Sequence, residues 1–244
     1  MGRWLGWWIL FGACGSPPAA PPEPIREPVP APDVEAADEP ATVLWIGGDV
    51  LLSEAIRDYA QLSDDPAQGM ASILAPMAAR WQRDEGAFVL VNLETPVANR
   101  RRYALNAEPT NPHGYTAVHL HGPRWLLPAL AQTGIDAVSL ANNHALDQDR
   151  EGLGETIRNA KEAGLLVTGA GVYPRERWPL VLGDERTMAV VALYDGRGRG
   201  YVEDGDPALS FLDDDSFTLV EALDAEHDAV VVTVHVLGEL VDEP

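Results

Sequence analysis

The sequence is poor in cysteine and in basic residues, and each shortage excludes a class of chemistry. Cys14 is the only cysteine in 244 residues, which excludes an intramolecular disulfide and any Cys-rich zinc or iron–sulfur site. Lys and Arg together number 17 against 38 Asp and Glu, so the net charge is −21. The electrostatic field of this negative charge would repel a nucleic acid, and we therefore expect no nucleic-acid partner.

The composition is otherwise that of a folded protein. Hydrophobic residues make up 46% and charged residues 23% of the chain, which supports one large domain or two small ones with a hydrophobic core. The apolar run from Trp4 to Phe11 is much shorter than the roughly 20 residues that span a bilayer. A permanent transmembrane helix is therefore not expected there.

The first 14 residues have the pattern of a signal peptide. Arg3 precedes the apolar run, and small residues, Gly12 and Ala13, lie directly before Cys14. This arrangement resembles a bacterial lipobox, in which the cysteine becomes the lipidated N-terminus. We expect an exported protein that is anchored to the membrane at the cell envelope through Cys14; the alternative is an ordinary secretory signal with an incidental cysteine.

Residues 15–41 are rich in proline and acidic residues and contain few large apolar ones. Such a segment cannot bury enough surface to fold, and we expect a disordered linker that holds a domain away from the membrane. The folded domain is expected to span residues 42–244.

Apolar strand patterns alternate with helical patterns along this domain. We therefore predict a layered α/β fold with a mostly parallel sheet covered by helices. Strands are expected at 42–46, 88–91, 137–140, 165–167, 188–193 and 229–234, and helices at 53–61, 72–83, 124–132, 151–163 and 217–225.

Polar side chains follow four of the predicted strands, where sites form in α/β sheets. Carboxylates, amides and imidazoles of this kind bind divalent cations of the Mn, Fe, Zn or Mg type, which activate water and stabilise phosphoryl charge. The candidates are Asp49; Asn92 and Glu94; Asn142, Asn143, His144 and Asp147; and His235 and Glu239.

Several of these residues also have purely structural interpretations. Asp49 could cap the next helix, the Asn142–His144 segment could be a turn in which Asn side chains bond their own backbone, and His235 could be a hydrogen-bonded core residue. The basic run Arg100–Arg102 indicates either a spot for an anionic ligand or a solvated loop.

Four segments in order along the chain resemble the CapA family of capsule-synthesis (poly-γ-glutamate) proteins, which have a calcineurin-like metallophosphoesterase fold. They are Gly48-Asp-Val-Leu-Leu52, Val91-Asn-Leu-Glu-Thr-Pro96, Gly134–His144 with Asp147, and Thr168-Gly-Ala-Gly171. The resemblance implies an exported, membrane-tethered domain that helps to make, export or anchor an anionic polymer.

The resemblance also implies residue roles. Asp49, Glu94 and Asn143 match metal ligands, and His235 matches the histidine of a later motif and is assigned to the metal set. By the same resemblance His144 is the general acid, with Asp147 as a further catalytic residue.

The later motif has its glutamate at Glu239. Two departures from the family pattern bear on this set: Leu51 replaces a histidine of the phosphoesterase signature, and a further His-bearing segment would follow Pro244. The domain is therefore expected to be incomplete at its C-terminus or to have a degenerate site.

Two functions follow from this reading of the chain. The first is metal-assisted hydrolysis or transfer at an anionic envelope polymer or a phosphorylated intermediate in capsule synthesis. The alternative is a non-catalytic polymer-binding module of the envelope with a degenerate metal site.

Overall fold

The computed structural model of the chain describes residues 43–102, 119–171, 179–196 and 208–236. Cys14, the linker and Glu239 lie outside these ranges. The strands are β1 Leu44–Asp49, β2 Phe88–Asn92, β3 Ala137–Ser139, β4 Leu166–Thr168, β5 Ala170–Gly171, β6 Leu180–Leu182, β7 Met188–Tyr194, β8 Ala208–Leu209 and β9 Ala229–His235. The helices are α1 Glu54–Ala60, α2 Pro66–Trp81, α3 Leu126–Gln132, α4 Asp149–Glu162 and α5 Asp214–Glu226.

A four-stranded parallel sheet with the order β1-β2-β3-β4 forms one layer. Since each strand is added beside the previous one in the same direction, right-handed crossovers place α1 to α4 on the same face. Val89 and Val91 point toward these helices and pack in their core, whereas Leu90 points the other way. Successive side chains of β2 thus point into two different hydrophobic cores, one on each face of the sheet.

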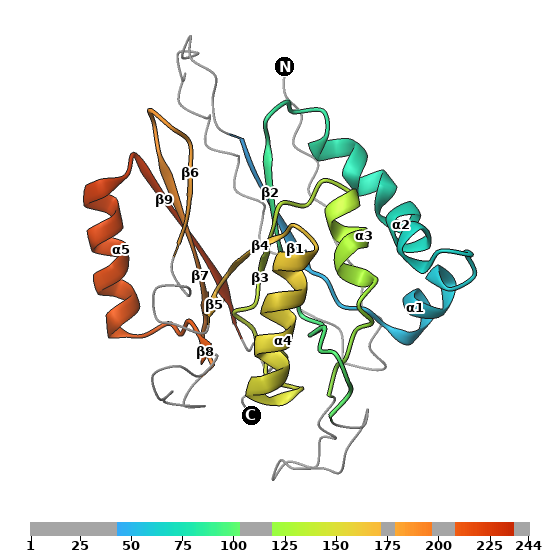
Figure 1. The fold of residues 1–244 in the computed structure, drawn as a ribbon. Helices are drawn as coiled ribbons and strands as arrows, with labels where there is room; N and C mark the ends of the chain where they lie inside the picture. Colours follow the sequence, from blue (N-terminus) through green and yellow to red (C-terminus); the bar gives the residue numbers. More distant parts are fainter. Residues whose placement is uncertain (1–42, 103–118, 172–178, 197–207, 237–244) are drawn as a thin grey trace, which may run out of the picture. The chain divides into compact units, whose positions relative to one another are not determined.

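A second sheet with the order β6-β7-β9 covers the other face. Leu90 and Ala137 of the first sheet pack with Val190 of β7, and Val231 of β9 lies against the same cluster. α5 packs on the outer side of this sheet through Leu223 and Leu219. Figure 1 shows α5 on one side of the two sheets and α1 to α3 on the other.

The layered α/β fold class expected from the sequence is confirmed, and it is compatible with a metallophosphoesterase-like fold. The structure adds that the second face of the parallel sheet is covered by another sheet. β7 and β9 are parallel and joined through α5, while β6 pairs antiparallel with β7. Apolar strand patterns do not distinguish burial under a helix from burial under a sheet.

α2 begins earlier than the helix expected at 72–83. Asp65 caps it, because its Oδ1 accepts a hydrogen bond of 2.9 Å from the backbone N–H of Ala67, and Pro66 at the first helical position has no N–H to satisfy.

No helix in the described part of the chain is long and apolar enough to cross a bilayer.

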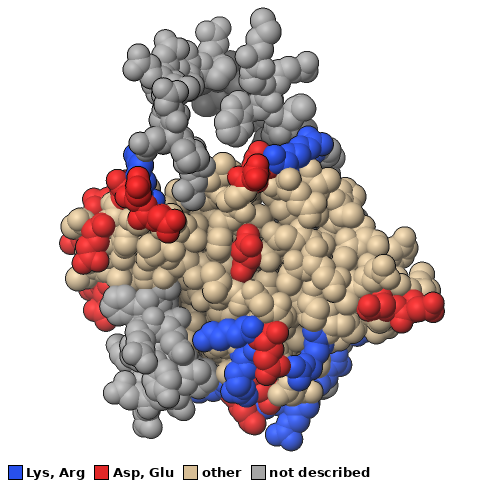
Figure 2. All heavy atoms as spheres, turned by 45° about the horizontal axis from the view of Figure 1, so that its top comes forward, with Lys and Arg blue, Asp and Glu red and all other residues tan. Residues whose placement is uncertain are grey.

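Charge is unevenly distributed over the surface. α5 carries Asp214, Asp215, Glu221, Asp224 and Glu226 and no basic residue. Figure 2 shows acidic side chains on the left of its view, the side on which Figure 1 places α5, while most of the basic side chains of this face gather at its lower edge. A polyanion would therefore be repelled from the α5 side.

Candidate functional site

The candidate site forms where the carboxyl ends of β1, β2, β3 and β9 meet. Asp49 and Asn92 are register partners at the ends of β1 and β2, and Ser139 pairs with Asn92 at the end of β3. His235 ends β9 in the second sheet. The site therefore lies between two sheets, at the edge where parallel strands present their following loops.

A local irregularity in β1 positions Asp49. The pairing of β1 with β2 shifts between Ile46 and Asp49, and a Cβ on Gly47 would lie 2.8 Å from Cγ1 of Val91. Glycine is needed at this close approach. The next helix, α1, is capped by Ser53, so the interpretation of Asp49 as a helix cap is wrong.

The imidazole of His235 lies in the middle of the predicted residues. Its Nδ1 is 3.7 Å from Oδ1 of Asp49, and its Nε2 is 3.8 Å from Oε1 of Glu94. The same Nε2 is 2.8 Å from Oδ1 of Asn143. The structure thus brings Asp49, Glu94 and Asn143 together around one side chain from another sheet.

The two asparagines Asn92 and Asn142 connect these groups to the backbone. Asn142 is fully buried; its Nδ2 donates to Oδ1 of Asn92 and to the carbonyl of Leu93, both at 3.0 Å. Its Oδ1 accepts from the backbone N–H of His144 at 3.0 Å. The turn interpretation of Asn142 is therefore correct, and the same side chain also reaches the site.

Gly169 supports this turn from behind. Its φ is +75°, and a Cβ there would lie 2.9 Å from the backbone N of Ala141, so a larger residue would displace the segment that leads into Asn142. This close approach explains why the segment Thr168–Gly171 accompanies the site residues in the sequence pattern.

His144 and Asp147 form a hydrogen-bonded pair at the start of α4. Nδ1 of His144 lies 2.8 Å from Oδ2 of Asp147, and the same oxygen accepts from the backbone N–H of Leu120 at 2.6 Å. The next residue, Gln148, donates to the carbonyl of Leu120 at 2.8 Å. Asp147 and Gln148 thus bond to the backbone N–H and the carbonyl of Leu120. These bonds fix the position of the Asp147 carboxylate, which orients His144.

Electrostatics at the site favour protonated His144. Burial lowers its pKa, but the hydrogen bond and the charge of Asp147, together with the charges of Glu94 and Asp49, outweigh burial and raise the pKa above its ordinary value. Nε2 of His144 lies 4.0 Å from Oε1 of Glu94. An imidazole placed in this way can carry a proton toward a group bound beside Glu94.

The pKa of Glu94 is also raised. Burial is the main cause and the charge of Asp49 adds to it, while His144 and His235 act in the opposite direction. Repulsion from the carboxylate of Asp49 disfavours the charged form of Glu94, and a cation between the two carboxylates would relieve that repulsion.

The oxygen donors of the site fit a hard divalent cation by their chemistry, since carboxylate and amide oxygens are its preferred ligands. Within the described ranges, no group of three or more His, Cys, Asp or Glu residues has the arrangement of a preformed metal site. The amide oxygen of Asn143 would have to complete a set with Asp49 and Glu94.

A cavity of about 220 Å³ adjoins the site between the two sheets. Asp49, Asn92 and His235 line its polar end, and its walls are mainly apolar, with Ile46 and Leu193 on opposite sheets. The cavity places open space directly beside the carboxylate of Asp49.

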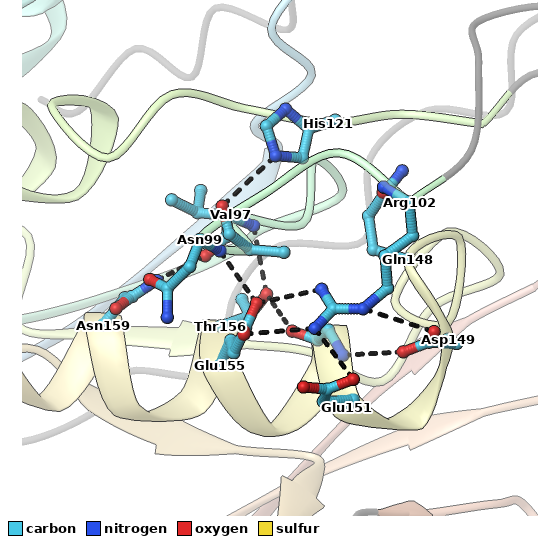
Figure 3. A network of polar contacts seen from close by, with 12 residues as sticks. Val97, Asn99, Arg102, His121, Gln148, Asp149, Glu151, Glu155, Thr156 and Asn159 are labelled. Carbon is cyan, nitrogen blue, oxygen red and sulfur yellow. Dashed lines mark hydrogen bonds and ion pairs between the residues drawn. The ribbon is translucent and has the colours of Figure 1, made fainter.

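A second polar network, which the sequence did not predict, anchors the segment before the site to α4. Arg102 is the last residue of the basic run, and its guanidinium group donates to both carboxylate oxygens of Glu155 at 2.9 and 3.1 Å. Figure 3 shows Asp149 and Glu151 around the same group. Arg102 is therefore neither solvated nor available to a ligand, and only Arg100 and Arg101 of the run are exposed.

The comparison with curated proteins found no match. A family model, described as bacterial capsule synthesis protein PGA_cap, matches residues 43–244. This match covers the parallel sheet, the β6-β7-β9 sheet, every helix in the described ranges and every described site residue. The chain therefore belongs to the bacterial capsule synthesis protein family PGA_cap.

Proposed function

We propose that this capsule synthesis protein performs metal-assisted hydrolysis or transfer on an anionic envelope polymer or a phosphorylated intermediate. The observation that carries the proposal is the convergence of Asp49, Glu94 and Asn143 around His235, with the His144–Asp147 pair beside them. Oxygen donors, an oriented imidazole and open space are the parts that such chemistry needs.

Asp49, Glu94 and Asn143 are the residues that would hold a divalent cation of the Mn, Fe, Zn or Mg type. The cation would supply an activated water and stabilise negative charge on a phosphoryl or carboxyl group. The proton transfer is performed by side chains of the protein itself. Asp147 keeps the proton on Nδ1 of His144, so the opposite nitrogen of the ring exchanges a proton with the leaving group.

The anionic character of the partner is supported by the placement of basic residues. Arg100 and Arg101 are exposed and directly precede Arg102, which fixes their segment on α4. We propose that the polymer approaches over this side rather than over acidic α5. The proposed anchor at Cys14 would hold the domain at the membrane surface where an envelope polymer is made.

The metal and turnover are tested together in the full-length protein. Purified wild type, Asp49→Ala and Asp64→Ala are incubated with Mn²⁺ and dialysed, bound metal is measured by elemental analysis, and hydrolysis of a chromogenic phosphodiester is followed. Asp64 is an exposed carboxylate outside the site and serves as the matched control. We expect Asp49→Ala to lose both metal and turnover and Asp64→Ala to keep both.

The outcomes separate the two functions. Equal metal in wild type and Asp49→Ala would refute the proposed ligand set. Metal-dependent retention of an anionic polymer without any turnover would instead support the non-catalytic binding module.

A further inference from the structure

Four side chains at the site form a continuous series of hydrogen bonds whose direction is fixed by the backbone. Asn142 is its anchor: its Oδ1 faces the N–H of His144 and its Nδ2 faces the carbonyl of Leu93. A backbone N–H only donates and a carbonyl only accepts. The amide of Asn142 therefore has one possible orientation.

This orientation determines the next amide. Nδ2 of Asn142 lies 3.0 Å from Oδ1 of Asn92, so that atom is the acceptor. Nδ2 of Asn92 consequently faces Oδ1 of Asp49 at 2.7 Å and Nδ1 of His235 at 3.3 Å. The carboxylate of Asp49 accepts one amide hydrogen, which agrees with this orientation.

The orientation of Asn92 in turn determines the tautomer of His235. An amide nitrogen donates and has no lone pair to offer, so Nδ1 of His235 must be unprotonated. A neutral imidazole carries one N–H, which then sits on Nε2, 2.8 Å from the amide oxygen of Asn143. That oxygen is an acceptor, and every bond of the series is satisfied.

We propose that Asn92, oriented by Asn142, is a positioning residue that fixes His235 as the Nε2–H tautomer and makes it a hydrogen-bond donor to oxygen at the site rather than a metal ligand. Nε2 carries the proton toward Asn143 and Glu94, and the amide N–H of Asn92 blocks the lone pair of Nδ1. A cation would then be held by oxygen atoms alone. The inference deepens the proposed function and rests on it only for the cation.

The tautomer is tested first in metal-free, full-length protein. Histidine is labelled with ¹⁵N, and long-range ¹H–¹⁵N correlations are recorded at about pH 8.5, about two pH units above the ordinary pKa of an imidazole. The signals of His235 are identified by their loss in His235→Gln. We expect a protonated Nε2 and an unprotonated Nδ1; the reverse assignment, or a mixture of both tautomers, overturns the proposal.

Asn92→Asp tests the role of the amide. It replaces the donor that faces both Nδ1 of His235 and Oδ1 of Asp49 with a carboxylate oxygen while keeping the acceptor for Asn142, so we expect Nδ1 of His235 to become protonated. Asn99→Asp is the matched control, because Oδ1 of Asn99 accepts from Arg124 and Asn159 and a carboxylate satisfies both donors. Circular dichroism verifies that both variants are folded. An Nδ1 of His235 that stays unprotonated in folded Asn92→Asp would refute the role of Asn92.

Zinc titration then tests whether His235 is a ligand. Zn²⁺ binds imidazole readily and is therefore the most demanding probe. We expect the Nε2–H signal of His235 to persist at saturating Zn²⁺, whereas its replacement by a metal-bound nitrogen signal would overturn the proposal. If no residue of the site responds to Zn²⁺, the proposed metal site fails while the tautomer result stands, so the two failures are distinguishable.

Discussion

Asn142, Asn143 and His144 are consecutive residues with three different tasks. Asn142 is buried and bonds to backbone groups of two segments, Asn143 presents its amide oxygen to His235, and His144 turns back to Asp147. Because the turn begins with a side chain that bonds its own backbone, the next two side chains leave in different directions. A short motif thus supplies structural support, the proposed ligand oxygen and the proposed proton carrier.

Replacing His144 with alanine should affect chemistry and leave the metal in place. The imidazole of His144 bonds to Asp147, which lies outside the proposed ligand set, and its Nε2 is 4.0 Å from Oε1 of Glu94. We therefore expect metal retention not to depend on it. General acid catalysis contributes about 10²- to 10⁴-fold, and we expect His144→Ala to lower turnover of a phosphoester probe by that order. Elemental analysis should find unchanged bound metal.

His227→Ala is the control for loss of an imidazole, because His227, at the C-terminal end of α5, bonds to Thr187, which directly precedes β7. Its turnover should match wild type. If His144→Ala lost as much metal as Asp49→Ala, His144 would be a ligand or a structural support, and its role as an acid would be abandoned.

At the level of elements, α4 organises the segment that precedes the site. Glu155 accepts from Arg102 and from the backbone N–H of Asn99, and Asn159 donates to the carbonyl of Val97 at 2.7 Å. Thr156 accepts from the N–H of Val97. Successive turns of one helix face therefore satisfy the backbone of an irregular segment, which would otherwise lie buried with unpaired polar groups.

The Arg102–Glu155 pair makes stability depend on acid pH. The hydrogen bonds from Arg102 lower the pKa of Glu155 to about 2 against the opposite effect of burial. A carboxyl with a depressed folded-state pKa stabilises the fold fully above its unfolded value of about 4.5 and loses this contribution as the pH falls toward 2. We expect Glu155→Gln to lower the free energy of unfolding at pH 7 by about 2 kcal/mol and to flatten its dependence on pH below about 4.5.

Urea denaturation at several pH values measures both effects. Glu162→Gln is the matched control: Glu162 pairs with Arg124 at 2.7 Å, but both side chains are more than half exposed, so the change should stay below about 1 kcal/mol. A Glu155→Gln variant as stable as wild type at pH 7, with the same acid dependence, would contradict the anchoring role.

The sequence predicted the helices and strands better than it predicted which side chains contact each other across the fold. Strands such as Phe88–Asn92 follow from a continuous apolar run, and the shared edge of Asp49, Glu94 and Asn143 follows from parallel strand ends. The role of Arg102 was not predictable from its neighbours, since its partner Glu155 is 53 residues away and a run of arginines resembles a solvated loop. Contacts of this range depend on packing rather than on local pattern.

For the whole molecule, the decisive feature is that the site belongs to two sheets. β1, β2 and β3 supply oxygen donors from one sheet, and β9 delivers His235 from the other. The sequence placed His235 at a strand end but gave no sign of the second sheet. We therefore expect the packing between the sheets, chiefly that of Leu90, Ala137 and Val190, to set the distances around the imidazole.

Truncating Leu90 tests this dependence. Leu90 is 1% exposed and packs against the second sheet, two residues before Asn92, so Leu90→Ala should lower the free energy of unfolding by about 2 to 5 kcal/mol and loosen the register between the sheets. The hydrogen bonds of His235 to Asn92 and Asn143 cross that interface. We therefore expect the ¹⁵N imidazole signals of His235 to shift or broaden in the folded variant.

Leu127→Ala provides the comparison that isolates the interface. Leu127 is also 1% exposed, but it packs in the core between α3 and the helix-covered face of the first sheet. It should lose a similar amount of stability, since the same side chain is removed from an equally buried position. Its His235 signals should remain as in wild type, because no contact between the sheets has changed. If both variants disturbed His235 equally, the imidazole would be responding to general loosening of the fold, and the packing between the sheets would not be what sets the geometry of the site.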